Sequence, residues 1–214
     1  MNLQPFVEAL PIERRLALSY GTGRGRVLML GLMALDQRLG QLVRQTREPM
    51  LAQIKLAWWR EQLDRSAAER AGGEPLLALL EHWGEAAGEL GALAAGWEAL
   101  LGDAPDFQAF AAARGDTCEA LAHALGQSEA APMAKKAGTA WALAELATKV
   151  SVPQEREAVL GAIAQAQWGA VRLPVGLRPL AVLHGLARRA GGKREFLDGF
   201  GAGLLAARLG LLGI

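Results

Sequence analysis

Apolar residues recur every three or four positions along most of the chain, which is the spacing of one face of an α-helix. Between residues 26 and 45, for example, Leu28, Leu35, Leu39 and Leu42 follow this spacing. We find no stretch with the alternation of apolar and polar residues that is typical of a half-buried strand. Prolines and glycines interrupt the periodicity and mark the ends of the elements. The pattern predicts helices over residues 12–20, 26–45, 49–71, 76–82, 85–101, 105–125, 133–150, 153–168, 178–190 and 194–209.

The number of these segments and the short gaps between them predict the fold class. Ala and Leu, which are strong helix formers, dominate the composition, whereas Ile, Thr, Tyr and Phe, which favour strands, are scarce. Roughly eight to ten helices with short connections make an all-α helical bundle. The chain has 214 residues and is 51% hydrophobic, so it can bury one sizeable core. No repeat or linker divides it, and we expect a single helical domain over residues 1–214.

The cysteine content and the length of the apolar runs predict the cellular compartment and whether the chain crosses a membrane. Cys118 has no partner for an internal disulfide, and a cysteine-rich metal site is excluded. We find no secretory leader at the start of the sequence, so a reducing cytoplasm is the expected compartment. The apolar run over residues 27–35 is far shorter than the roughly 20 residues that a membrane-spanning helix needs. We therefore expect no transmembrane segment.

Charge changes from basic to acidic to basic along the chain. The net charge of +1 argues against bulk binding of nucleic acid. Residues 1–60 carry a net charge of +5, residues 61–130 carry −10 and residues 131–214 carry +6. Segments of opposite sign can pair in the folded chain or be solvated. The alternative is a basic face that binds phosphates or an anionic membrane surface, which would place the protein in peripheral contact with the inner membrane.

A dense run of aromatic and basic residues over 44–63 is the strongest candidate for a binding site. Trp58 and Trp59 are adjacent, so on a helix they point about 100° apart, and one can pack inside while the other lies near a groove. One interpretation places both rings in the core with Arg60 over their edge. The other is a ligand groove or a partner surface, because Trp and Arg dominate such sites. The candidate ligand- or partner-binding residues are Arg44, Arg47, Lys55, Trp58, Trp59, Arg60 and Arg172.

Three glutamates are the best candidate for clustered carboxylates. Glu81, Glu85 and Glu89 would line one face of a continuous helix, but Gly84 would weaken that helix. Their neighbours are Ala, Gly and Trp rather than further acids, so we interpret the row as a solvated surface. The three histidines are far apart in the sequence and do not show metal-ligand spacing. The residues predict no metal site.

Several blocks of the sequence resemble the squalene/phytoene synthase family. The most specific is Trp58-Trp59-Arg60-Glu61, and residues 34–39, 112–116, 137–143 and 173–180 fit the family in the same order. The resemblance spans most of the chain and implies an isoprenoid-synthase-like bundle around a central cavity. Enzymes of this family join two prenyl diphosphates. Their two aspartate-rich motifs bind magnesium ions, which neutralise the departing diphosphate.

Both motifs are incomplete in this chain. Asp36 has no acid four residues later, and at the second position only Glu145 is acidic, with Lys149 nearby. The resemblance therefore implies a non-catalytic branch, similar to an assembly factor for mitochondrial respiratory complex I that lacks the same motifs. We expect a cofactor-free binding or assembly protein that acts on a protein partner or an isoprenoid-like lipid. The alternative is a prenyl diphosphate-condensing transferase with an atypical magnesium site, built from Asp36 and Glu145 or from the three glutamates.

Overall fold

A computed structural model describes residues 2–46, 48–166, 168–191, 196–197 and 200–213 of the chain. All regular structure in these ranges is helical, so the all-α prediction is confirmed. The α-helices of eight or more residues are α2 (Ile12–Ser19), α3 (Gly23–Gln45), α4 (Pro49–Asp64), α6 (Gly91–Glu98), α7 (Phe107–Ala124), α8 (Ala131–Lys149), α9 (Pro153–Gln165), α10 (Arg178–Ala190) and α11 (Phe200–Ala207). The remaining pieces are the short α-helices α1 (Gln4–Glu8) and α5 (Pro75–Leu80), the 3₁₀ segments η1 (Ala67–Glu69), η2 (Glu81–Leu90), η3 (Ser128–Ala130) and η4 (Val175–Leu177), and the π-helical η5 (Arg208–Leu212).

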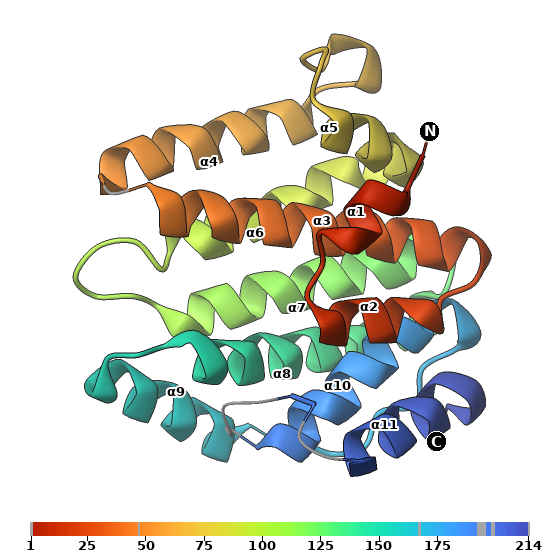
Figure 1. Ribbon diagram of the computed structural model, residues 1–214. Coiled ribbons are helices and arrows are strands. Elements are labelled where there is room, and N and C mark those ends of the chain that lie inside the picture. Colours follow the sequence, from red (N-terminus) through yellow and green to blue (C-terminus); the bar gives the residue numbers. More distant parts are fainter. Residues whose placement is uncertain (1, 47, 167, 192–195, 198–199, 214) are drawn as a thin grey trace.

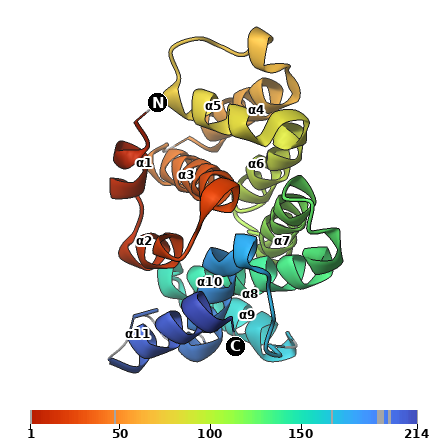
Figure 2. The same cartoon turned by 90° about the vertical axis from the view of Figure 1, so that its right-hand side faces the viewer.

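The helices lie side by side in a stack. In Figure 1 the stack runs from α4 at the top through α3, α6, α7 and α8 to α10 and α11 at the bottom. Figure 2 shows α1 and α2 on one flank, where α2 packs against both α3 and α10. A continuous apolar core extends through the stack from Leu10 to Ala206. Helices from both halves of the sequence therefore contribute to one interior.

One expected helix ends early, and the expected interruption at Gly84 is present. The helix expected over residues 49–71 ends at Asp64, because the Ser66 N–H and hydroxyl both donate to the Glu69 carboxylate and start a new turn. The helix expected over 85–101 is replaced by η2 and α6. Gly84, with φ of 60° and ψ of −134°, breaks η2 near its start. A side chain at that φ would be strained, so glycine permits this bend.

Helices α7 and α8 approach each other closely because two glycines lie between them. A Cβ atom on Gly115 would be 2.3 Å from Thr139 Oγ1, and one on Gly138 would be 2.6 Å from Cys118 Sγ. Neither distance is compatible with a real side chain. The glycines therefore allow side chains of α7 to reach those of α8.

The charged segments pair with one another, as one interpretation of the sequence predicts. Arg38 Nη2 of the basic N-terminal part lies 3.6 Å from Glu74 Oε2 of the acidic middle part. From the basic C-terminal part, Lys135 Nζ lies 3.1 Å from Glu119 Oε2, again in the middle part. These pairs are partly exposed, so each contributes about 0–1 kcal/mol. In the part of the chain that the structure describes, no helix is both long and apolar enough to cross a membrane.

Candidate functional site

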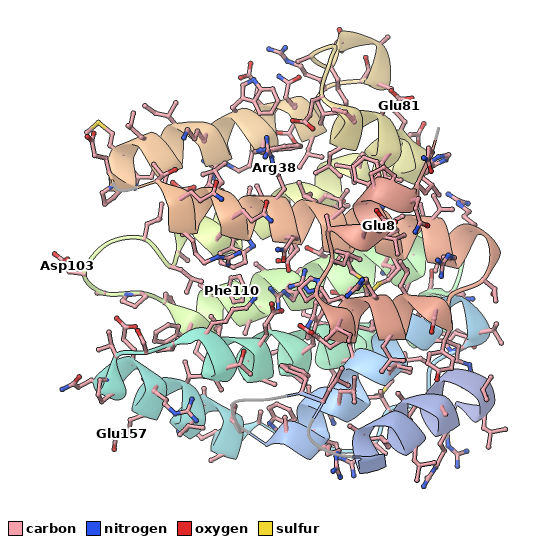
Figure 3. All side chains as sticks on the ribbon, in the orientation of Figure 1. Glu8, Arg38, Glu81, Asp103, Phe110 and Glu157 are labelled. Carbon is pink, nitrogen blue, oxygen red and sulfur yellow. The ribbon has the colours of Figure 1, made fainter. Side chains whose placement is uncertain are left out.

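Four charged side chains from four helices meet inside the bundle. Arg14 comes from α2, Asp36 from α3, Arg114 from α7 and Glu145 from α8, and each is at most 3% exposed. We call these four residues the arginine–carboxylate cluster. Figure 3 marks its place by Phe110, which lies in the middle of the molecule and contacts Arg114.

Helical register explains why these charges are buried. Arg14 is four residues before the buried Leu18, so both lie on the same face of α2. Arg114 is four residues from both Phe110 and Cys118, which are also buried. Each arginine thus lies on the buried face of its helix, at a position where the apolar pattern predicts an apolar residue.

Both oxygens of Asp36 are saturated with N–H donors. Oδ1 accepts from Trp97 Nε1 at 2.9 Å and from Arg114 Nη2 at 3.0 Å. Oδ2 accepts from Arg14 Nη2 at 2.7 Å and from Arg114 Nη2 at 2.9 Å. Two charge-assisted donors and an indole N–H therefore hold this carboxylate in place.

Glu145 is held in the same way. Its Oε1 accepts from Arg14 Nη2 at 2.8 Å and also from Lys149 Nζ. Its Oε2 accepts from Arg14 Nη2 and Arg114 Nη1, both at 2.8 Å. Arg14 Nη2 therefore bridges Asp36 and Glu145, so the two carboxylates are brought to one place.

Aromatic rings complete the surroundings of the cluster. The guanidinium carbons of Arg14 and Arg114 lie 4.9 Å and 4.4 Å from the centroid of the Trp141 ring. The guanidinium of Arg114 also lies 4.6 Å from the Phe110 ring. A desolvated cation–π contact is worth about 2 kcal/mol. These rings offset part of the cost of burying two guanidinium groups.

The surroundings favour the charged forms of Asp36, Glu145 and Arg14. Burial alone would raise the carboxyl pKa values, but Arg114 and Arg14 outweigh it and lower the pKa of Asp36. For Glu145, Arg14 and Arg114 likewise overcome burial and hold the pKa well below its usual value. Burial opposes the charge on Arg14 too, yet the two carboxylates raise its pKa. The cluster is therefore a balanced set of two anions and two cations, with Lys149 at its edge.

This donor set does not fit a magnesium ion. Mg²⁺ needs oxygen ligands at about 2.0–2.1 Å in octahedral geometry. All four oxygens of Asp36 and Glu145 already accept N–H groups, and the surrounding charges are positive. Releasing a guanidinium to admit the ion would leave buried charge unpaired, at a cost of about 3–5 kcal/mol.

The row of three glutamates is not a metal site either. Glu81, Glu85 and Glu89 are exposed, and Glu81 lies at the edge of the molecule in Figure 3. The bend at Gly84 prevents a continuous α-helical face, and Glu89 borders a different surface hollow from Glu81 and Glu85. The described residues contain no group of three or more His, Cys, Asp or Glu side chains that could hold a metal.

Part of the candidate binding set lies at a groove between α3 and α4. Trp58 is 36% exposed and Trp59 is 2% exposed, so one ring faces outward and the other packs inside, as their spacing predicts. Their centroids are 5.2 Å apart with the rings nearly perpendicular. Both rings line a groove of about 700 Å³ together with Lys55 and Arg38, and Figure 3 shows Arg38 between the two helices.

An exposed apolar row follows α4 beside this groove. Met50, Ile54 and Trp58 are spaced by four residues, so they lie on one face of the helix, and Leu51 adjoins them. We call Met50, Leu51, Ile54 and Trp58 the α4 face. A contiguous exposed apolar patch on a folded protein marks an interaction surface.

The other candidate residues lie elsewhere. Arg60 faces α6, where its Nη1 is 3.1 Å from Glu98 Oε2. Arg44 is exposed near the end of α3, and Arg172 lines a separate cavity beside α10. Arg47 falls outside the described residues. The structure therefore brings together Lys55, Trp58 and Trp59 but not the whole set.

Sequence analysis missed Arg14 and Arg114 as site residues. The signal that identifies them is an arginine at a core-facing position of an otherwise apolar helical pattern. A charge at such a position must find a partner of opposite sign, because an unpaired buried charge is very costly.

No family model, curated protein or solved structure matches the chain. The resemblance to squalene/phytoene synthases therefore stays a prediction.

Proposed function

We propose that this chain is a non-catalytic binding or assembly protein, built like the branch of the squalene/phytoene synthase family that lacks the aspartate-rich motifs. The observation that supports this most directly is the bridge from Arg14 Nη2 to both Asp36 and Glu145. These are the two acids that the resemblance places at the metal-binding positions. Here guanidinium groups neutralise them.

A prenyl diphosphate leaving group requires positive charge around it. Release of a prenyl diphosphate builds negative charge, and the known way to stabilise it is a set of metal ions held by free carboxylate oxygens. In this chain the oxygens of Asp36 and Glu145 are engaged by Arg14, Arg114 and Lys149. The cluster therefore ties four helices together, and its role is structural.

The binding surface in this proposal is the α4 face with its groove. An apolar row of Met50, Ile54 and Trp58 beside Lys55 fits the apolar side of a partner's amphipathic helix. An isoprenoid-like lipid in the groove is the other occupant to be tested. The combination of apolar and basic groups also fits peripheral contact with an anionic membrane. A cytoplasmic location beside such a membrane stays part of the proposal.

The absence of catalysis is tested by measuring pyrophosphate release from farnesyl and geranylgeranyl diphosphate with and without magnesium. A known synthase of the family serves as the positive control. We expect no magnesium-dependent release. Turnover that disappears with EDTA would contradict the proposal and favour the prenyltransferase alternative with Asp36 and Glu145.

The binding surface is tested with the variant Ile54→Ser/Trp58→Ser, which removes the centre of the α4 face. A protein captured by the wild-type chain and identified by mass spectrometry should bind the purified wild-type chain and lose most of its affinity for the variant. Val152→Ser, which removes an exposed apolar side chain at the start of α9, is the matched control. Equal binding to all three chains would exclude the α4 face as the partner surface.

A further inference from the structure

A second cavity lies at the opposite end of the stack from α4, between α10 and the C-terminal helical segments (Figure 1). Its volume is about 410 Å³, and its walls include Arg172, Arg188, Arg189 and Arg208. The described residues that line it include no carboxylate. Arg189 and Arg208 already take part in other interactions, so Arg172 and Arg188 are the lining cations on which an anion site depends. Guanidinium groups on a concave surface concentrate positive potential and attract anions.

A close approach of two helical segments builds the cavity. A Cβ atom on Gly185 of α10 would lie 2.0 Å from Leu209 Cδ1, so glycine is required for η5 to pack here. This packing places Arg208 of η5 and Arg188 of α10 on the same hollow. Arg172 reaches it from the segment before η4, so three separate parts of the chain supply the positive groups.

A buried histidine forms part of the wall. His184 is 2% exposed, and its Nε2 has no hydrogen-bond partner among the described residues. Burial, followed by the charges of Arg188 and Lys136, lowers the pKa of His184 to about 4, so the imidazole is neutral near pH 7. A buried polar nitrogen without a partner is unfavourable unless a ligand or water completes it. Its position therefore indicates a site for a bound polar group, and in the tautomer with the proton on Nε2 that group is a hydrogen-bond acceptor.

We propose that this cavity binds a phosphate group, with Arg172 and Arg188 at its mouth and His184 Nε2–H at its base. The planar guanidinium fork matches two oxygens of a phosphate, and the imidazole N–H can donate to a third. Phosphate carries more charge than a carboxylate, which suits a site that presents both Arg172 and Arg188. The site is distant from the α4 face and goes beyond the function proposed for that face.

Two sources can supply this chemistry, a free phosphate ion or the headgroup of a phospholipid. Leu204 and Leu211 are exposed on the C-terminal helical segments that border the cavity. Apolar side chains beside a basic pocket are also what a protein uses to rest on an anionic lipid surface. The experiment therefore has one arm for each source.

In the first arm, inorganic phosphate is titrated into the full chain while the side-chain NMR signals of its histidines are followed. We expect a saturable shift of the His184 signals, with those of the exposed His82 and His123 unchanged. Arg172→Gln and Arg188→Gln should each weaken the affinity about tenfold, the effect of one lost charge-assisted hydrogen-bonding group. Arg65→Gln, which removes an exposed arginine just after α4, should leave it unchanged.

In the second arm, flotation measures binding to phosphatidylcholine vesicles with and without phosphatidic acid. Binding that requires phosphatidic acid and is lost in Arg172→Gln and Arg188→Gln assigns the site to a headgroup. Binding of phosphate alone, with the same variant dependence, assigns it to the free ion. The proposal is overturned if neither ligand binds, or if Arg65→Gln loses as much affinity as the cavity variants.

Discussion

Replacing Arg14 with methionine removes the bridge of the arginine–carboxylate cluster while keeping a long apolar side chain in its place. The variant loses hydrogen bonds from Nη2 to Asp36 and to both oxygens of Glu145, and one from Nη1 to the Met33 carbonyl at 3.2 Å. It also loses the contact with the Trp141 ring. Two buried carboxylates then share Arg114 and the partly exposed Lys149.

We expect this change to lower the free energy of unfolding by about 3–5 kcal/mol, the usual cost of breaking a buried ion pair by removing one partner. For a chain of this size, about 1 kcal/mol corresponds to roughly 2–4 °C in melting temperature, so Tm should fall by roughly 10 °C. Arg15→Met is the matched control, because Arg15 is the next residue on α2 and is exposed. Urea unfolding gives the free energy of unfolding and thermal unfolding gives the Tm, each followed by circular dichroism and tryptophan fluorescence.

A second substitution separates charge balance from simple loss of packing. Glu145→Gln alone leaves an excess of positive charge, with Arg14, Arg114 and Lys149 facing only Asp36. In Arg14→Met/Glu145→Gln one cation and one anion are removed together, so the net charge of the cluster with Lys149 returns to its wild-type value, and the double variant should be more stable than the sum of the single losses by about 1–3 kcal/mol. Unfolding free energies that simply add, or an Arg14→Met variant as stable as Arg15→Met, would refute the electrostatic account of the cluster.

Three further outcomes follow from the same structure. Because the folded-state pKa values of Asp36 and Glu145 are lowered, the stabilisation from the cluster is complete above the ordinary carboxyl pKa of about 4 and declines as pH falls through the folded-state pKa values. The free energy of unfolding in urea should therefore decrease more steeply between neutral and acid pH for the wild type than for Arg14→Met, and parallel pH dependences would contradict this. Burial raises the pKa of the Cys118 thiol to about 12, so a thiol reagent at pH 8 should modify it at the rate of unfolding, whereas rapid reaction with folded protein would show an accessible thiolate. Gly138→Ala should lower the free energy of unfolding by about 1–3 kcal/mol, because its Cβ would lie 2.6 Å from Cys118 Sγ. Gly161→Ala in α9, which has open space around it, should raise the free energy of unfolding by about 0.5–1 kcal/mol. Similar unfolding free energies for the two variants would contradict the close packing of α7 on α8.

The helical fold was predictable from the sequence because periodicity reports burial directly. The outward and inward directions of Trp58 and Trp59 followed from the same rule. The end of the helix at Asp64 was not predictable, since the local bonds of Ser66 decide it, whereas the break at Gly84 falls in the gap between the helices expected over residues 76–82 and 85–101. Such short-range competition leaves little trace in an apolar pattern.

The candidate site was predictable only in part. The search for acids separated by four residues found Asp36 and Glu145 as lone carboxylates, but it could not show that two arginines, from helices distant in the sequence, neutralise them. Arg60 was grouped with Trp58 by adjacency, yet successive residues on a helix point in different directions, and Arg60 faces Glu98. Partners that meet through tertiary packing require the fold before they can be named.

The bridge between Arg14 and Glu145 also constrains how the chain can fold during synthesis. The two residues are 131 positions apart, so the ribosome has made most of the protein before α2 can complete its ion pairs. Until then, docking α2 onto α3 would bury Arg14 and Asp36 before Glu145 and Arg114 are present to complete their ion pairs, which is unfavourable. The cluster therefore favours late, concerted closure of the nascent bundle over stepwise assembly from its N-terminus.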